Sequence, residues 1–269
     1  MSLRVVTFEE PEDPHFNMAV EEAIPRARGC DIVGDTLRLW RNANAVIIGY
    51  FQRAEEEVNL DVAEAMGAAV VRRFTGGGAV YHDLGNLNYA LSLSASGRPA
   101  SLDYVFSELL RGPVEALRSL GFSAEVQNVN DIVVSGRKVS GTAATISWGS
   151  VFFHGAMLVS TDLARLASVL KVPAKKLIDK GVSSVKYRVT NLSELGRVTV
   201  DDIVGRLAES FSKLLGYNSY RLSLLTPEEL EIANVLYNEK YTKREWNYER
   251  APHRAFARAE GEIARVCKR

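Results

Sequence analysis

A run of three glycines that follows two arginines is the part of the sequence best suited to binding an anion. The segment reads RRFTGGGAVYHDLGNLNYA, residues 72–90. Glycines carry no Cβ atom, so the amides of residues 76–78 can approach a phosphate or carboxylate closely, and Arg72 and Arg73 add guanidinium groups beside the same anion. Three glycines weaken regular structure by about 1 kcal/mol each relative to alanine, and a bound ligand would offset that cost. The alternative is a tight loop flanked by surface arginines, because the run matches neither the GxxxxGK[ST] phosphate loop nor GxGxxG.

A lysine within a predicted hairpin is the second candidate. Residues 128–143, NVNDIVVSGRKVSGTA, contain two strand-like runs around the turn at Ser135 and Gly136, and Lys138 begins the second run. If Lys138 points into a pocket, its ammonium can stabilise charge that develops on a substrate carboxylate and a phosphate. Asp131 is then a candidate Mg2+ ligand, because magnesium is normally held by one or two carboxylates together with phosphate oxygens. The alternative is a solvated lysine at a sheet edge and an aspartate that only begins a strand.

The remaining residues with chemical potential are histidines and cysteines. His154 follows the apolar run 151–153 and can contact a ligand, although a packed, hydrogen-bonded histidine explains the position equally well. Cys30 and Cys267 lie near opposite ends of the chain and in no CxxC or Cys/His spacing. We therefore expect neither a disulfide framework nor a zinc site.

The elements that must position these residues follow from periodicity and turn residues. Strands are predicted at 36–40, 45–51, 68–74, 87–93, 131–134, 137–145 and 151–160. Helices are predicted at 16–24, 58–67, 102–121, 162–170, 201–216 and 226–241. Pro25 is expected to end or kink the first helix, which should therefore be short. Without regular βαβ spacing, this order predicts an α+β fold with a twisted mixed or antiparallel sheet flanked by helices, as one domain to about residue 220.

Composition excludes several classes of protein. The 269 residues are 46% hydrophobic, enough for a sizeable core, and 33 basic side chains balance 33 acidic ones. The balance gives no general footprint for nucleic acid or an anionic membrane. Acidic residues interrupt the first twenty positions, and no apolar run reaches membrane-spanning length, so we expect a cytoplasmic protein.

Several ordered segments resemble the lipoate-protein ligase A family, within the superfamily shared with biotin ligases and octanoyltransferases. The matching segments are 13–24, 39–49, 72–86, 130–143, 154–170, 181–195 and a degenerate match at 239–252. They cover most of the chain, and together they favour the ligand-binding interpretation of each segment over the alternatives above.

The resemblance implies a biotin/lipoate ligase-like fold and a bifurcated pocket for an acyl chain and a nucleotide. It implies that ATP activates lipoate to lipoyl-AMP, with Mg2+, and that the lipoyl group passes to a lysine of an acceptor protein. The acceptors implied are lipoyl domains of 2-oxoacid dehydrogenase E2 subunits and the glycine-cleavage H protein. No partner role for nucleic acid or membrane is implied.

The resemblance also assigns roles to residues. Lys138 is implied as the catalytic residue that contacts both ATP and lipoate. The other ATP-contacting positions are Arg73, Gly78, Ala79, Val80 and Tyr81. The other lipoate-contacting positions are Arg72, Gly76, Gly77, His82 and His154, and the metal position is Asp131. Octanoyltransferases use an acyl-enzyme cysteine, whereas both cysteines here lie outside the segments that match the site, so covalent catalysis is not expected. Octanoate can still enter such a pocket, because a hydrophobic pocket discriminates poorly between acyl chains that differ only at one end.

The C-terminal region departs from the family pattern. Family members continue into a small accessory domain, whereas this chain stops at Arg269 and carries Glu249 where the family usually has glycine. Our hypothesis is a catalytic domain at residues 1–252 that works with a separate accessory protein. Residues 253–269 form a helical tail, in which Phe256, Ala259, Ile263 and Val266 form one apolar face, for partner docking or for packing on its own domain. Alternatives are a self-sufficient short ligase, a lipoyltransferase that uses preformed lipoyl-AMP, and a non-catalytic lipoate-binding subunit.

Overall fold

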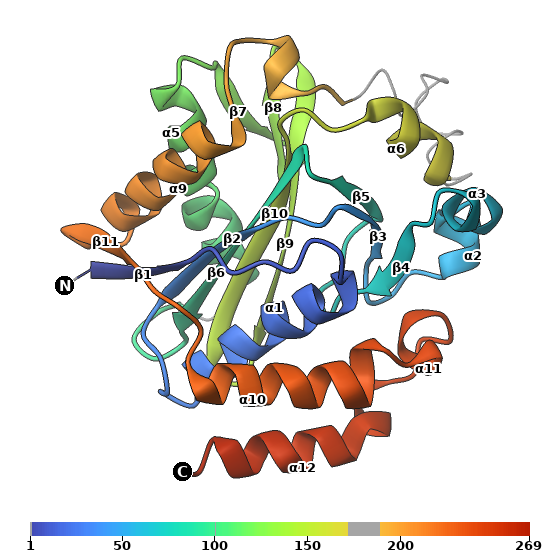
Figure 1. Ribbon diagram of the computed structural model, residues 1–269. Helices are drawn as coiled ribbons and strands as arrows, with labels where there is room; N and C mark the ends of the chain where they lie inside the picture. The colour runs from blue at the N-terminus through green and yellow to red at the C-terminus, as the bar shows by residue number, and fades with distance from the viewer. Residues whose placement is uncertain (1, 100, 172–188) are drawn as a thin grey trace.

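The computed structural model describes residues 2–99, 101–171 and 189–269 (Figure 1). The first part of the matching segment 181–195, including Gly181, lies outside the described residues. No helix within the described ranges is long and apolar enough to cross a membrane.

An eight-stranded sheet forms the centre of the molecule. Its strand order is β11 (Ser219–Leu222), β1 (Ser2–Val6), β2 (Thr36–Trp40), β6 (Asn86–Ser94), β10 (Ser150–Leu158), β9 (Arg137–Ser147), β8 (Asp131–Val134), β7 (Ala124–Gln127). β1 pairs in parallel with β11 and β2, while every other pair in this sheet is antiparallel. The predicted mixed sheet is therefore confirmed, and the predicted hairpin is β8–β9.

A three-stranded sheet carries the glycine run. β3 (Asn44–Ile48) lies between β4 (Ala69–Arg72), with which it is parallel, and β5 (Val80–Asp83), with which it is antiparallel. Residues 73–79 connect β4 to β5, so the glycines follow a buried strand, as predicted. The short helices α2 (Ala54–Glu57), α3 (Leu60–Ala65) and α6 (Leu163–Val169) pack at this sheet (Figure 1).

Helices cover both faces of the large sheet (Figure 1). On one face lie α4 (Leu102–Tyr104), a π-helical turn at Val105–Leu109, α5 (Arg111–Ser119) and α9 (Val200–Leu214), whose apolar residues share one core with the strands. On the other lie α1 (Pro14–Gly29), α10 (Pro227–Leu236), α11 (Arg244–Asn247) and α12 (Ala257–Val266), around a second core. α9 and α10 each begin with a capping box, at Thr199 and Thr226, which satisfies otherwise unpaired amides of the first turn.

The first helix is longer than predicted. α1 runs for 16 residues through Pro25. Proline removes one hydrogen bond and crowds the carbonyl of the residue four positions earlier, at a cost of about 3 kcal/mol. The helix continues because every residue from Asn17 to Ala27 is buried between the sheet and α10, so packing offsets this local cost.

The C-terminal tail is part of the same body. Phe256, Ala259, Ile263 and Val266 are buried in the core that also contains α1. Cys30, directly after α1, forms a disulfide with Cys267, directly after α12, with their Cα atoms 5.4 Å apart. The expectation of unpaired cysteines is therefore wrong. A sequence separation of 237 residues gives no indication of pairing, which depends on α12 packing beside α1.

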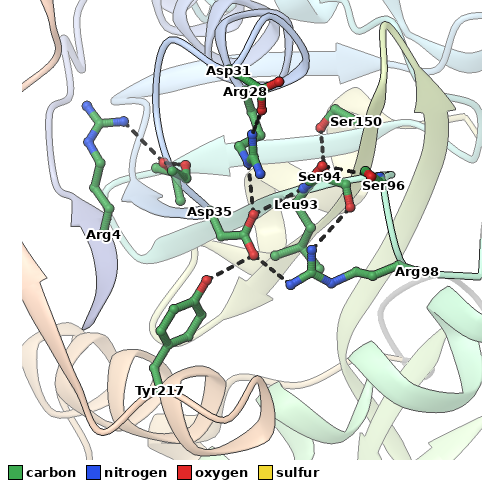
Figure 2. A network of polar contacts seen from close by, with 12 residues as sticks. Arg4, Arg28, Asp31, Asp35, Leu93, Ser94, Ser96, Arg98, Ser150 and Tyr217 are labelled. Carbon is green, nitrogen blue, oxygen red and sulfur yellow. Dashed lines mark hydrogen bonds and ion pairs between the residues drawn. The ribbon is translucent and has the colours of Figure 1, made fainter. Parts of the chain in front are cut away.

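A buried carboxylate fixes the end of the large sheet opposite the small one. Asp35 accepts hydrogen bonds from Arg28 at 2.9 Å, Arg98 at 2.7 Å, the Tyr217 hydroxyl at 3.0 Å and the Ser94 amide at 3.1 Å (Figure 2). Burial by itself raises the pKa of Asp35, but these donors outweigh it and hold that pKa below its ordinary value. This network joins α1, the end of β6 and the turn after α9.

Candidate functional site

The glycine loop folds around the side chain of Arg73. The guanidinium Nη2 donates to the carbonyl of Gly76 at 2.6 Å and of Gly78 at 2.9 Å, and Nε donates to Thr75 Oγ1 at 3.1 Å. Within the described residues, the amides of residues 76–78 donate to no protein acceptor. The loop therefore directs carbonyls toward a buried cation and leaves a row of amides available, which is the arrangement that an anion requires.

Arg73 itself has no carboxylate partner among the described residues. Burial lowers its pKa to about 10, so the guanidinium remains charged at neutral pH. Glu21 lies close enough for its charge to raise that pKa, but it forms no ion pair with Arg73. Arg73 organises the loop, and its predicted contact with ATP stays a prediction.

A glycine that the sequence analysis missed lies against the loop. A Cβ atom on Gly49, at the end of β3, would lie 2.2 Å from the Gly77 carbonyl oxygen. Gly77 has φ of +95°, and a Cβ there would lie 2.8 Å from Arg73 Nη2. Both positions need glycine. In the sequence, Gly49 is distinguished only by its position directly after an apolar run that forms a buried strand.

Arg72 points to the other side of β4 and is fully engaged. Its Nη1 donates to three carbonyls of residues 49–52, its Nε to the carbonyl of Trp246 at 2.8 Å and its Nη2 to the carbonyl of Asn247 at 3.0 Å. The indole of Trp246 returns a hydrogen bond to the Arg72 carbonyl at 2.8 Å. Arg72 thus connects the loop after β3 to the C-terminal segment, and this placement favours a structural role over the predicted contact with lipoate.

Lys138 and Asp131 form an ion pair across the β8–β9 hairpin. Their Nζ and Oδ1 atoms are 2.6 Å apart, and both side chains are partly exposed. A Cβ on Gly141 would lie 2.8 Å from this Nζ, so that glycine gives the lysine its path along β9. The described residues contain no group of three or more potential metal ligands. Asp131 by itself fits Mg2+ only as one carboxylate beside phosphate oxygens.

His82 is a buried donor without a partner. Its Nδ1 lies 3.2 Å from the Asn42 amide and 3.4 Å from the Asn88 amide, so Nδ1 accepts and the proton is on Nε2. His82 Nε2 and Trp40 Nε1 have no hydrogen-bond partner among the described residues, and the centroids of the two rings are 6.0 Å apart. Burial, aided by the charge of Arg73, lowers the pKa of His82 to about 3, so the ring is neutral. Buried orphan donors of this kind are what a bound ligand can satisfy.

His154 lies next to the glycine loop with both ring nitrogens engaged. Nε2 lies 2.7 Å from Thr75 Oγ1 and Nδ1 lies 3.1 Å from Glu21 Oε1. His154 was predicted from the sequence to belong to the site, whereas Glu21 and Thr75 were not. Glu21 is one of two consecutive glutamates in an amphipathic helix, and nothing local distinguishes it.

The structure brings most of the predicted residues together. The position of a Cβ on Gly77 is 3.7 Å from the Ala143 Cβ, which places the glycine loop against β9, the strand that carries Lys138. Val80 and Tyr81 begin β5, with the Tyr81 ring buried and its hydroxyl bonded to Asn44 at 3.1 Å. At Tyr81 only the backbone is therefore available to a ligand.

A surface groove of about 480 Å3 lies elsewhere. It lies between α10 and α12 and contains none of the predicted site residues. Its Glu231, Glu239 and Glu262 are paired with Arg258 or Arg269. We place the site at the glycine loop, whose amides donate to no protein acceptor among the described residues, and not at this groove.

Comparison with known proteins identifies the family of this chain. Residues 13–212 match the family model described as the lipoyl protein ligase A/B catalytic domain. Lipoate-protein ligase A subunit 1 of Thermoplasma acidophilum is 38% identical over 92% of this chain and 97% of its own length. Lipoate-protein ligase LplJ of Bacillus subtilis is 34% identical over 89% of this chain but only 72% of its own length.

Solved structures give the same result. A bipartite lipoate-protein ligase from Thermoplasma acidophilum, studied with its E2 lipoyl domain, superposes with a TM-score of 0.84 at 36% identity, covering 94% of this chain and 98% of that one. A lipoate-protein ligase A bound with ATP superposes with a TM-score of 0.83 at 35% identity, covering 93% of this chain and 100% of that one. The resemblance seen in the sequence is thus confirmed, and the chain belongs to the lipoyl protein ligase A/B catalytic-domain family.

Proposed function

We propose that this chain activates lipoate with ATP and transfers the lipoyl group to a lysine of an acceptor protein. The observation that carries the proposal is the glycine loop, which wraps Arg73, leaves its amides unpaired and lies against the strand of Lys138. Two related structures support the choice of ligands: one relative is bound with ATP, and a Thermoplasma acidophilum relative is bound with lipoic acid.

In the first half-reaction, a carboxylate oxygen of lipoate attacks the α-phosphorus of ATP, and pyrophosphate leaves. The amides of residues 76–78, with the backbone of residues 79–81, orient the phosphates, and Lys138 stabilises the charge on the α-phosphate and the carboxylate. Asp131, the carboxylate paired with Lys138, would hold Mg2+, which supplies further neutralisation of phosphate charge when bound.

In the second half-reaction, the acceptor lysine amine attacks the acyl carbonyl and AMP leaves. The adenylate is already activated, so the enzyme needs no nucleophile of its own, and both cysteines are joined in a disulfide. We assign the unpartnered Nε2 donor of His82 and the neighbouring Trp40 to the acyl-chain pocket. His154 completes that region by holding Thr75.

The acceptors in this proposal are lipoyl domains of 2-oxoacid dehydrogenase E2 subunits and the glycine-cleavage H protein, in the cytoplasm, where ATP is abundant. We also propose a separate accessory protein, because this chain spans nearly all of the Thermoplasma subunit and about three quarters of the Bacillus enzyme. The apolar face of α12 is used within the domain, so docking through residues 253–269 would use the polar face of that helix.

The decisive experiment is lipoylation of a purified acceptor domain by this chain, with ATP and Mg2+, beside the same assay with preformed lipoyl-AMP. Activity with ATP supports a self-sufficient ligase and removes the need for an accessory protein. Activity only with lipoyl-AMP supports the transfer role and leaves adenylation to a two-protein complex. Inactivity in both assays would contradict the proposal and favour a non-catalytic lipoate-binding subunit.

A further inference from the structure

Four buried side chains from three separate parts of the chain form one hydrogen-bonded line that ends at the glycine loop. Glu21 on α1 contacts His154 on β10 at 3.1 Å, His154 contacts Thr75 at 2.7 Å, and the hydroxyl of Thr75 accepts from Arg73 Nε at 3.1 Å. Glu21 is 2% exposed, Thr75 1%, Arg73 5% and His154 9%, so water does not substitute for these contacts.

For a neutral imidazole, the direction of each hydrogen bond in this line follows from its two ends. Arg73 only donates, and the Glu21 carboxylate accepts. Thr75 Oγ1 accepts from Arg73, so its own proton is free to go to His154 Nε2, and the imidazole proton then lies on Nδ1 and goes to Glu21. The other tautomer, with the proton on Nε2, would place the Nδ1 lone pair against the Glu21 carboxylate, which is unfavourable.

We propose that Glu21 and Thr75 are positioning residues that hold Arg73, and through it the glycine loop, in the conformation that presents its amides to ATP. The inference rests on the proposed function. Neither residue needs to touch a substrate. Arg73 reaches the carbonyls of Gly76 and Gly78 with Nη2, and its Nε donates both to Thr75 Oγ1 and to the Gly76 carbonyl at 3.1 Å. Thr75 Oγ1 is the side-chain acceptor among these contacts, so it helps to fix the plane of the guanidinium and hence the direction of both carbonyls.

Charge supports the same assignment. Among the described residues, Glu21 is the carboxylate whose charge offsets the burial of Arg73, and it makes the largest such contribution for the buried Arg38 as well. Arg38 donates to the carbonyl of Asn17, one helical turn before Glu21, at 2.7 Å. A single carboxylate on α1 thus stabilises two buried cations, one in the large sheet and one in the loop.

The first test reads the imidazole protons by 15N NMR of the histidine rings, at a pH above about 7.5, where free imidazole is neutral. The chain has only four histidines, which makes assignment by substitution practical. We expect the proton of His154 on Nδ1 and, as an internal contrast, that of His82 on Nε2. In Glu21→Ala the His154 proton should move to Nε2. A His154 proton on Nε2 in the unaltered protein would overturn the proposal.

The second test compares Thr75→Val, which keeps the shape but loses the hydroxyl, with Thr75→Ser, which keeps the hydroxyl. In Thr75→Val the KM for ATP should rise about 10- to 100-fold in lipoate-dependent pyrophosphate exchange, since His154 Nε2 loses its partner and Arg73 Nε keeps only the Gly76 carbonyl. Thr75→Ser should stay within about threefold of the unaltered protein. The KM for the acceptor protein in transfer from lipoyl-AMP should be unchanged.

Thr161→Val is the matched control, because that threonine is equally buried but its hydroxyl has no partner among the described residues. A role confined to stability would lower the active fraction and kcat while leaving the KM for ATP unchanged, and that result in Thr75→Val would overturn the proposal. If the unaltered protein shows no lipoate-dependent exchange, the proposed function fails at that step, whereas the NMR test still decides whether the line of hydrogen bonds exists.

Discussion

Gly49 and Gly77 touch across the end of β3, so closely that a Cβ on Gly49 would lie 2.2 Å from the Gly77 carbonyl oxygen. That carbonyl belongs to the loop organised by Arg73. Tyr50, the residue after Gly49, also contacts the loop, because its amide donates to the Thr75 carbonyl at 2.8 Å. The conformation of the glycine loop therefore depends on the absence of a side chain at a position 28 residues earlier, as well as on its own three glycines.

Gly49→Ala should displace the loop, because the contact is with backbone and cannot be relieved by a rotamer change. We expect a loss of at least about 100-fold in adenylation and a destabilisation of about 1–3 kcal/mol. Pyrophosphate exchange and thermal unfolding are the measurements. Gly205→Ala is the control: it lies in α9 with open space at its Cβ position, and it should gain about 0.5–1 kcal/mol. Full activity in Gly49→Ala would mean that the loop adapts.

Lys138→Ala should remove activity while the protein stays folded. The ion pair with Asp131 is partly exposed, so its loss should change the free energy of unfolding by at most about 1 kcal/mol. Adenylation should fall about 100- to 1000-fold, as for removal of one electrostatic stabiliser of a transition state. Urea unfolding and pyrophosphate exchange measure the two effects, and retained adenylation would remove Lys138 from the mechanism.

Asp131→Asn separates two roles of the carboxylate. If Asp131 holds Mg2+, the variant should need a higher Mg2+ concentration for half-maximal adenylation; if it only orients Lys138, that concentration should be unchanged and kcat should fall. Titration of Mg2+ at saturating ATP distinguishes the two.

Cys267→Ser should destabilise the protein by about 2–5 kcal/mol, because the disulfide links residues 237 positions apart and restricts the unfolded chain. A thiol reductant should lower the melting temperature of the unaltered protein and leave that of Cys267→Ser unchanged. Adenylation at low temperature should be unaffected. If reductant has no effect on the unaltered protein, the two cysteines are not joined in solution.

Acid should unfold the protein partly through His82. The folded state keeps this ring neutral down to about pH 3, whereas the unfolded chain takes up a proton near the ordinary pKa of about 6.5. Between these values the unfolded state binds more protons, so stability falls as the pH falls. From pH 7 to 4.5 the expected loss is about 2–3 kcal/mol.

His82→Gln should show a smaller decrease over this range, measured by urea unfolding at each pH. The window ends at 4.5 because Glu22, whose pKa is held at about 2 by Lys240 and Arg26 against the effect of burial, begins to lose its own contribution below that pH. An equal decrease in both proteins would assign the acid sensitivity to other groups.

Local patterns in the sequence determined the α+β class, the β8–β9 hairpin, the helices α9 and α10, and the glycine loop after a strand. They did so because periodicity and glycine report backbone conformation and burial over a few residues. The resemblance to a ligase family extended those patterns to a function, and the match of residues 13–212 confirmed the family.

Tertiary structure decided which of two adjacent arginines organises the loop and which holds residues 49–52 to Trp246. Successive residues of a strand point to opposite faces, and the sequence by itself does not say which face meets the loop. It also decided the roles of Glu21 and Gly49, the persistence of α1 through Pro25 and the pairing of Cys30 with Cys267. Each of these depends on a partner brought close by packing of the whole chain, and no local pattern encodes contacts between residues so far apart in sequence.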